Sequence, residues 1–167
     1  MVSKKNIKKL QSLRPKGVSR LLLLARRNFV TEIGALIEKS GFPVLPDSCL
    51  MLLPYIELEG TRSTDIAHRA SMSKQAVTQV IGIMEKVKLV EKKLDPNDAR
   101  ATLISFTEFG AAYLMHMHTI INKVESDLGE KIGEEQMALF RSVLDFMAYS
   151  WPAATASQII SGAKPPE

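Results

Sequence analysis

The chain has 167 residues, of which 46% are hydrophobic and 24% charged, and its formal net charge is +4. A chain of this length and composition can bury a core without disulfides, and the single Cys49 excludes an internal disulfide framework and is typical of a reducing cytoplasm. No run approaches the roughly 20 apolar residues that a membrane span requires, and the apolar run within 20–27 is too short for a signal peptide. We therefore expect a cytoplasmic protein with no membrane partner.

Charge is distributed unevenly along the chain. Residues 1–40 carry ten basic and two acidic residues, residues 60–100 carry eight and five, and residues 108–150 carry three and seven. A protein that lays one face on phosphate needs such segregation, whereas a uniformly solvated helical protein does not.

The N-terminal part predicts a basic arm followed by a long helix. Residues 1–17 contain no acidic residue and are either a solvated, partly disordered tail or an extra phosphate-contacting segment. Over 18–40 apolar residues recur at helical spacing, and Gly41 is a good terminator. Because this apolar stripe is wider than one partner element covers, it indicates burial against a second protomer as well.

A shorter helix is expected over about 47–58, capped by Asp47 or Ser48 and kinked or ended early by Pro54. Cys49 lies on this helix, and we interpret it as a buried small hydrophobe. The alternative is a redox-sensing thiol, which requires a pKa lowered by nearby positive charge or by a helix N-terminus.

Residues 63–107 are the stretch around which the chain is organised. Ser63 or Thr64 is expected to cap a short helix, and Ser73 a second one that runs to about residue 87.

Two helices joined by so short a turn must cross steeply, with small residues at the crossing. The spacing of Ala67, Ser71 and Val77 is the packing pattern of a helix-turn-helix, although an αα-hairpin in a structural bundle shares it.

The outward face of the second helix carries the candidate base-reading side chains. Glutamine bonds bidentately to an adenine edge, threonine meets either base edge, lysines at the helix ends suit phosphates, and free amides at the helix start add an anchor. The candidate DNA contacts here are Ser73, Lys74, Gln75, Thr78, Gln79 and Lys86. The alternative is an ordinary solvated face, for which Gln75, Thr78 and Gly82 are unusual choices where Glu and Lys would give solubility.

A hairpin is predicted to follow, because residues 89–94 and 102–106 are strand-like and residues 95–98 form a strong turn. A two-stranded hairpin behind a helix-turn-helix is a winged helix. Its tip carries Asp98 and Arg100, which a mere connection does not need. The alternative is that these two form only a surface ion pair.

At this point the sequence resembles the multiple-antibiotic-resistance regulator (MarR) family of winged-helix transcription factors. The matching segments are 73–77 (SKQAV), 89–91 (LVE), 95–100 (DPNDAR) and 103–110 (LISFTEFG). The family usually has glycine where Lys88 stands, so lysine there is strained if its φ is positive.

The resemblance implies that Arg100 enters a minor groove and that Asp98 braces it. It also implies a small effector, often an aromatic acid or phenol, held between the dimerising helices and the winged domain. The candidate lining residues are Arg26, Arg27, Met51, Tyr55 and Met115.

The last part predicts two helices, at about 107–130 with Thr107 as the cap and at 134–150, with Gly129 and Gly133 bracketing the break. Together with the helix at 18–40 they would build a dimer interface, as in the family that the chain resembles. The alternative is a monomeric helical core. His116 and His118, two residues apart, point to different faces of a helix and make a poor metal pair.

The predicted fold class is therefore mainly α, a winged helix-turn-helix with a two-stranded wing plus N- and C-terminal dimerisation helices. The predicted parts are the basic arm 1–17, the dimerisation region 18–45 with 108–167, and the DNA-binding region 46–107.

The predicted function is a homodimeric repressor that binds a pseudo-palindromic operator in double-stranded DNA and is released by a small ligand. The alternatives are a redox-sensing regulator acting through Cys49, or a winged-helix module that binds protein. We find no glycine-rich phosphate loop, nucleophile motif, paired carboxylates or metal cluster, so we expect no enzyme and no cofactor.

Overall fold

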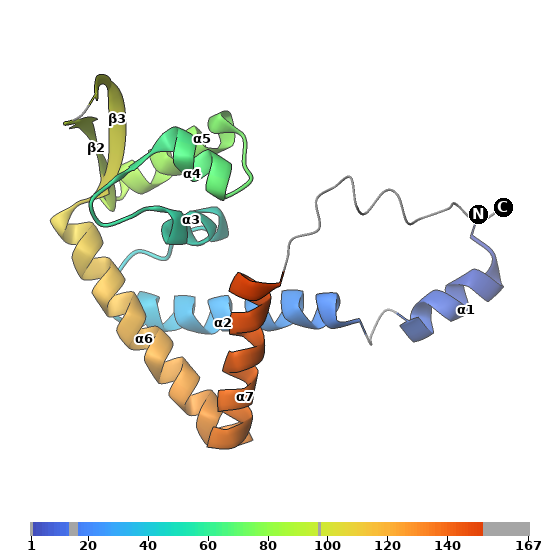
Figure 1. Ribbon diagram of the computed structural model, residues 1–167. Coiled ribbons are helices and arrows are strands. Elements are labelled where there is room, and N and C mark those ends of the chain that lie inside the picture. Colours follow the sequence, from blue (N-terminus) through green and yellow to red (C-terminus); the bar gives the residue numbers. More distant parts are fainter. Residues whose placement is uncertain (1, 14–16, 97, 152–167) are drawn as a thin grey trace. The chain divides into compact units, whose positions relative to one another are not determined.

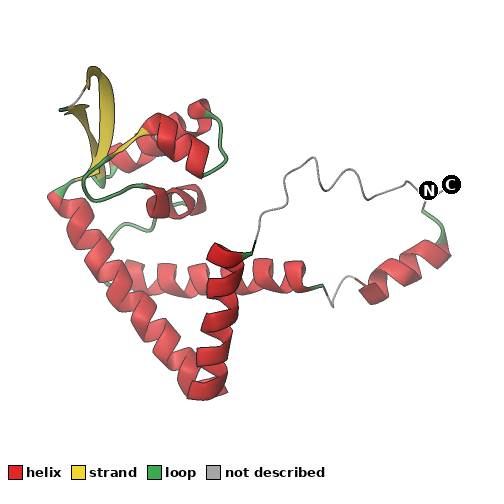
Figure 2. Ribbon diagram, viewed as in Figure 1, coloured by secondary structure: helices red, strands yellow, loops and turns green. Residues whose placement is uncertain are grey.

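The computed structural model describes residues 2–13, 17–96 and 98–151, without the side chains of residues 99 and 100. By its contacts the chain divides into two units, the first ending at Val124 and the second beginning at Glu125. The described strands all lie in the first unit, which also holds the helix-turn-helix (Figure 2).

Helices flank the central region in the sequence on both sides. They are α1 (Lys4–Leu13), α2 (Val18–Lys39), α6 (Glu108–Ile132) and α7 (Glu134–Asp145), followed by one turn of π-helix, η3 (Phe146–Ser150). The predicted helices at 18–40, 107–130 and 134–150 are confirmed to within a few residues.

The break between α6 and α7 comes at Gly133 alone, where φ is +95°. The prediction that Gly129 also marks the break is wrong. Gly129 continues the helix, its carbonyl accepts a hydrogen bond of 2.8 Å from the Gly133 N–H, and the place of its missing side chain faces Met137.

The central region is a winged helix (Figure 1). Its elements are α3 (Asp47–Leu52), a 3-10 turn η2 (Leu53–Tyr55), β1 (Thr61–Arg62), α4 (Ser63–Arg69), α5 (Lys74–Lys86), β2 (Val90–Asp95) and β3 (Asp98–Phe106). The sheet is antiparallel in the order β1-β3-β2, and its register shifts at Leu94/Asp95, beside the hairpin tip. The predicted hairpin is confirmed, and β1 adds a third strand of two residues, which is too short to leave a pattern in the sequence.

Two predicted helix caps are wrong by one residue. Arg62 is the N-cap of α4, and Ser63 and Thr64 already belong to the helix. Pairing of β1 with β3 holds Arg62 extended up to the first helical residue, so the helix starts earlier than a side-chain cap would place it.

The same shift occurs at α3, where Pro46 is the N-cap and neither Asp47 nor Ser48 caps the helix. The carboxylate of Asp47 instead accepts hydrogen bonds of 2.7 and 3.1 Å from Arg26 on α2. The predicted early end at Pro54 is confirmed, because α3 stops at Leu52 and Pro54 stands inside η2.

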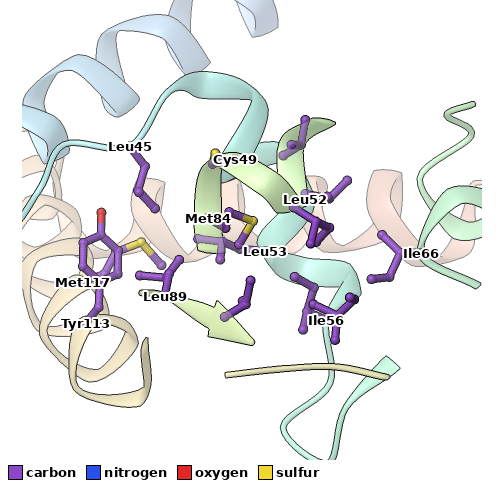
Figure 3. Close-up of a cluster of buried hydrophobic side chains, with 14 of the residues drawn as sticks. Leu45, Cys49, Leu52, Leu53, Ile56, Ile66, Met84, Leu89, Tyr113 and Met117 are labelled. Carbon is purple, nitrogen blue, oxygen red and sulfur yellow. The ribbon is translucent and has the colours of Figure 1, made fainter. Parts of the chain in front are cut away.

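The core of the first unit lies between the C-terminal part of α2, α3, α4, α5, the sheet and α6 as far as Val124, and Figure 3 shows part of it. Helix α5 contributes four buried side chains, Val77, Val80, Ile81 and Met84. Burying a side chain of this size is worth about 1.5–3 kcal/mol, so this stripe fixes which face of α5 points outward.

Both helices of the helix-turn-helix end in a Schellman motif without glycine. After α4, Met72 N–H bonds to Ala67 C=O (2.9 Å), and after α5, Leu89 N–H bonds to Met84 C=O (2.9 Å). The left-handed residues are Ser71 (φ +52°) and Lys88 (φ +60°). The positive φ expected at Lys88 is therefore present, and a second one closes the turn itself.

The strand-to-helix exit is closely packed at Gly110. A Cβ at this position would lie 1.9 Å from the backbone oxygen of Leu89, so a larger residue cannot fit without moving the backbone. Thr107 caps α6 as predicted, because its Oγ1 accepts a hydrogen bond of 2.9 Å from the Gly110 N–H. The end of α5, the wing and α6 thus meet at one rigid point.

Candidate nucleic-acid interface

Helix α5 presents its polar face to solvent. Gln75, Thr78 and Gln79 are exposed, on the side opposite the buried stripe, and Lys74 and Lys86 are exposed at the two ends. The structure therefore has the predicted arrangement, in which amides and a hydroxyl point outward from a helix packed on the core.

The N-terminus of α5 is organised by Ser73, whose Oγ accepts a hydrogen bond of 3.1 Å from Ala76 N–H. The cap is the predicted one. The first backbone N–H groups of a helix have no partner within it, and they point along the axis with the positive end of the helix dipole. This end of α5 is suited to hold an anion such as a phosphate oxygen.

Thr78 differs from its two glutamine neighbours. Its Oγ1 donates a hydrogen bond of 2.9 Å to the carbonyl oxygen of Lys74, one turn earlier on the same helix. With its proton used in this way, Thr78 has an acceptor and a methyl group to offer a base edge, while Gln75 and Gln79 keep both amide donors and acceptors.

The wing is tied to the start of α4 by Arg62. Its Nε and Nη2 donate hydrogen bonds of 2.8 and 2.5 Å to Oδ2 of Asp95, which is buried, and its Nη2 lies 3.7 Å from Oδ2 of Asp98. The hydrogen bond to Asp95 raises the pKa of Arg62. Arg62 therefore offsets the negative charge of two carboxylates at the hairpin tip.

Sequence reasoning missed this connection, because Arg62 and Asp95 stand 33 residues apart and neither belongs to a recognisable motif. Of the two predicted wing residues, Asp98 lies at the tip beside Arg62. The side chain of Arg100 is outside the described part of the chain, so its place in a groove and its bracing by Asp98 stay predictions.

Cys49 lies in the core and is fully buried (0% exposed) on α3. Burial raises the pKa of its thiol, which is the opposite of what a reactive thiolate requires. The structure therefore supports the packing role for Cys49 and gives no support to the redox-sensing alternative.

A cavity of about 510 Å³ opens between α2, the α3–η2 segment and α6 in the first unit. Its wall is mostly apolar, with Ile33, Leu53 and Leu114 among its side chains, and it has two polar groups, Arg26 and His118. Volume and composition are those of a small-molecule site.

Of the lining residues predicted for an effector, Arg26 lines this cavity and Met51, Tyr55 and Met115 do not. Met51 and Met115 are exposed, at 52% and 67%, because they stand on the outer faces of their helices. Arg27 lines a separate surface depression with Leu23 and Asp47.

The two histidines of α6 have separate surroundings. His116 stacks on Phe42 with a centroid distance of 4.8 Å, whereas His118 lines the cavity. In the described part of the chain, no group of three or more His, Cys, Asp or Glu side chains is placed to hold a metal ion. Over the same residues, no helix is both long and apolar enough to cross a bilayer.

Sequence comparison places the central region in a family. Residues 45–101 match the model of the MarR family, from the end of the loop before α3 into the second strand of the wing. This region is similar to the MarR family and has the winged-helix fold. The match covers the helix-turn-helix and the hairpin tip that carry the candidate contacts, and no curated protein is significantly similar to the chain in sequence.

Solved structures of transcription regulators are similar over most of the chain. The repressor CouR bound to a 23-mer DNA duplex aligns with a TM-score of 0.63 and 19% identity, covering 80% of this chain and 94% of its own. CouR from Rhodococcus jostii RHA1 bound to p-coumaroyl-CoA aligns with a TM-score of 0.61 and 18% identity, covering 83% of this chain and 96% of its own. Apo MarR from E. coli aligns with a TM-score of 0.61 and 16% identity, covering 78% of this chain and 96% of its own. At these identities the likeness establishes the fold.

Proposed function

We propose that this chain is a MarR-type homodimeric transcription regulator that represses by binding a pseudo-palindromic operator. The observation that carries the proposal is the outward face of α5, where Gln75, Thr78 and Gln79 stand exposed on a helix that four buried side chains hold in place. A rigid helix with amides on its outer face is suited to read base edges in a major groove.

The dimer is supported by apolar surface on the flanking helices. In α7 none of the side chains is buried, and Leu139, Phe140 and Val143 are 66%, 40% and 48% exposed. In α2 only Ile33 and Ile37 are buried, near its C-terminal end. A second copy that covers these faces would supply a second reading helix, and a dimer of this kind binds two half-sites about one turn of B-DNA (~34–36 Å) apart.

In this complex the wing lies over the flanking minor groove, and Arg100 is its groove contact. Narrow minor grooves at A·T tracts concentrate negative potential, which favours an arginine over an uncharged side chain. Arg62 supports this role, because it offsets the two carboxylates that would otherwise repel phosphate at the tip.

Release by a small ligand is supported by the cavity between α2, α3 and α6. An apolar wall with Arg26 and His118 fits an aromatic acid or phenol, whose ring would be buried while its anionic or hydroxyl group meets the polar pair. The cavity adjoins both the proposed dimerisation helix α2 and the start of the winged helix. An occupant there can therefore change the distance between the two reading helices, and with it the affinity for DNA.

The test is an anisotropy titration of a labelled duplex from the region upstream of the gene, at 50 and 200 mM salt, with the mass of the free protein measured by light scattering. We expect a dimer that binds this duplex more tightly than a shuffled one and loses affinity steeply with salt. A monomer that ignores DNA at both concentrations contradicts the proposal and leaves a protein-binding winged helix as the function.

A further inference from the structure

Helix α1 has a charged face that the winged helix does not explain. Its four lysines occupy consecutive turns on one side, within about 140° around the axis at 3.6 residues per turn. These lysines are Lys4, Lys5, Lys8 and Lys9. The opposite side carries Ile7, Leu10 and Leu13, so charge and apolar surface are separated along the helix.

No acidic residue stands near this lysine face in the sequence. The first acidic residue of the chain is Glu32, and in the described part of the chain none of the ion pairs involves a lysine of α1. All described residues of α1 are exposed. The positive charge is therefore available to a partner.

The charge pattern costs the helix stability when it is free. Lys4 with Lys8 and Lys5 with Lys9 are like-charge pairs four residues apart, which repel, and a helix of ten residues is marginal in water by itself. A face needed only for solubility would pair lysines with glutamates at this spacing. A row of lysines without paired glutamates is instead suited to bind a polyanion, which neutralises the charge.

We infer that the lysine face of α1 is a second phosphate-binding surface, which contacts the backbone of duplex DNA outside the stretch read by α5 and the wing. The inference rests on the proposed function and extends it. Helix α1 is joined to α2 through residues 14–17, and four residues plus a ten-residue helix reach about 30 Å from Val18, close to one helical turn of DNA.

The chain is longer than the part that the similar structures cover. The similar structures are covered over 94–96% of their own length but align with 78–83% of this chain, so about a fifth of the chain has no counterpart in them. An anionic membrane is a poorer partner, because the apolar side of α1 has three aliphatic residues and lacks the Trp and Phe typical of membrane-surface helices.

The experiment compares wild type with the variant Lys4→Gln/Lys5→Gln/Lys8→Gln/Lys9→Gln in the full-length protein. Glutamine is also a good helix former, so charge is removed with little change in helix propensity. Each phosphate contact contributes about 0.9 to the slope of log affinity against log salt. Four contacts contribute about 3.6 to the slope for each protomer, so between 50 and 200 mM salt wild type should lose about 150-fold more affinity than the variant for each protomer bound to the duplex.

A matched pair of double variants controls for net charge. Lys4→Gln/Lys8→Gln is expected to lower the salt slope by about two for each protomer, and Lys39→Gln/Lys131→Gln, which removes the same charge from exposed sites elsewhere, by less than half a unit. Trimming the duplex by about one turn at each end should abolish the difference between wild type and the quadruple variant while sequence preference remains.

Equal salt slopes for wild type and the quadruple variant on the long duplex would overturn the inference, with operator binding and the proposed function intact. So would retention of wild type, but not the variant, on vesicles of anionic phospholipid together with unchanged DNA slopes. If wild type binds no DNA at any salt concentration, the proposed function itself fails, and this outcome is distinct from the first two.

Discussion

Helices α5 and α7 both carry an apolar stripe, but only α5 buries it within the described chain. In α5 four apolar side chains are buried and the glutamines remain outside, whereas in α7 no residue is buried and Phe140 and Val143 stay exposed. The face that a helix leaves uncovered indicates its partner. Uncharged amides on α5 suit base edges, and exposed apolar side chains on α7 suit a second protein surface.

The largest expected effect comes from placing charge on the apolar face of α7. Phe140→Glu/Val143→Glu should convert the dimer into a monomer in light scattering and weaken operator binding by about 100-fold or more, because the two half-sites are no longer bound together. Ala138→Glu/Ser142→Glu adds the same charge on the other side of α7 and should leave the dimer intact. A dimer that survives the first pair would show that α7 is not the interface.

A smaller effect is expected on the reading face of α5. Gln79→Ala should weaken binding to the operator by about 1–3 kcal/mol and leave binding to unrelated duplexes nearly unchanged, because a bidentate base contact carries the discrimination. Competition titrations with point-substituted operators measure this change. Asn122→Ala, at an exposed amide on α6, serves as the control and should change neither affinity.

The wing is expected to behave differently from α5. Arg100→Ala should weaken operator and non-operator DNA by the same factor, about tenfold, and reduce the salt slope by about one per wing. Affinity titrations over a range of salt concentrations measure both quantities. Should Arg100→Ala and Gln79→Ala lose affinity equally on every sequence, the division of roles between wing and helix is wrong.

The smallest effect on DNA binding is expected at Gly82 of α5, where one substitution should change stability and operator affinity in opposite directions. A Cβ at Gly82 meets nothing within 4 Å, so Gly82→Ala should raise the free energy of unfolding by about 0.5–1 kcal/mol while the added methyl group lowers operator affinity. Denaturant unfolding and anisotropy give the two values. Gly110→Ala should have the opposite effect on stability, a loss of more than about 2 kcal/mol, because its Cβ collides with the Leu89 carbonyl.

Features with local causes could be predicted from the sequence. The stripe and cap of α5 depend on residues within one or two turns, and the resemblance to a family that usually has glycine at position 88 raised the left-handed φ of Lys88 as a condition. Strand β1 and the bond from Arg62 to Asp95 could not be predicted, because two residues make no periodic pattern and the pair meets only after the sheet has formed.

The misplaced caps have the same origin. Ser63 and Asp47 are good capping residues by type, but tertiary contacts decide where these helices begin: the pairing of Arg62 in β1 in the first case, and Pro46 with the ion pair to Arg26 in the second. Local preference fixed the existence of each helix, and long-range contacts fixed its first residue.

The two left-handed closures at Ser71 and Lys88 have a mechanical consequence. Since main-chain hydrogen bonds lock both ends of the segment that contains α5, its direction is settled during folding, before any other molecule arrives. Substitutions at these two positions would therefore redirect the helix while every side chain that touches a base is still present. A set of such variants would therefore test different spacings between the two DNA half-sites while the side chains that contact the bases stay the same.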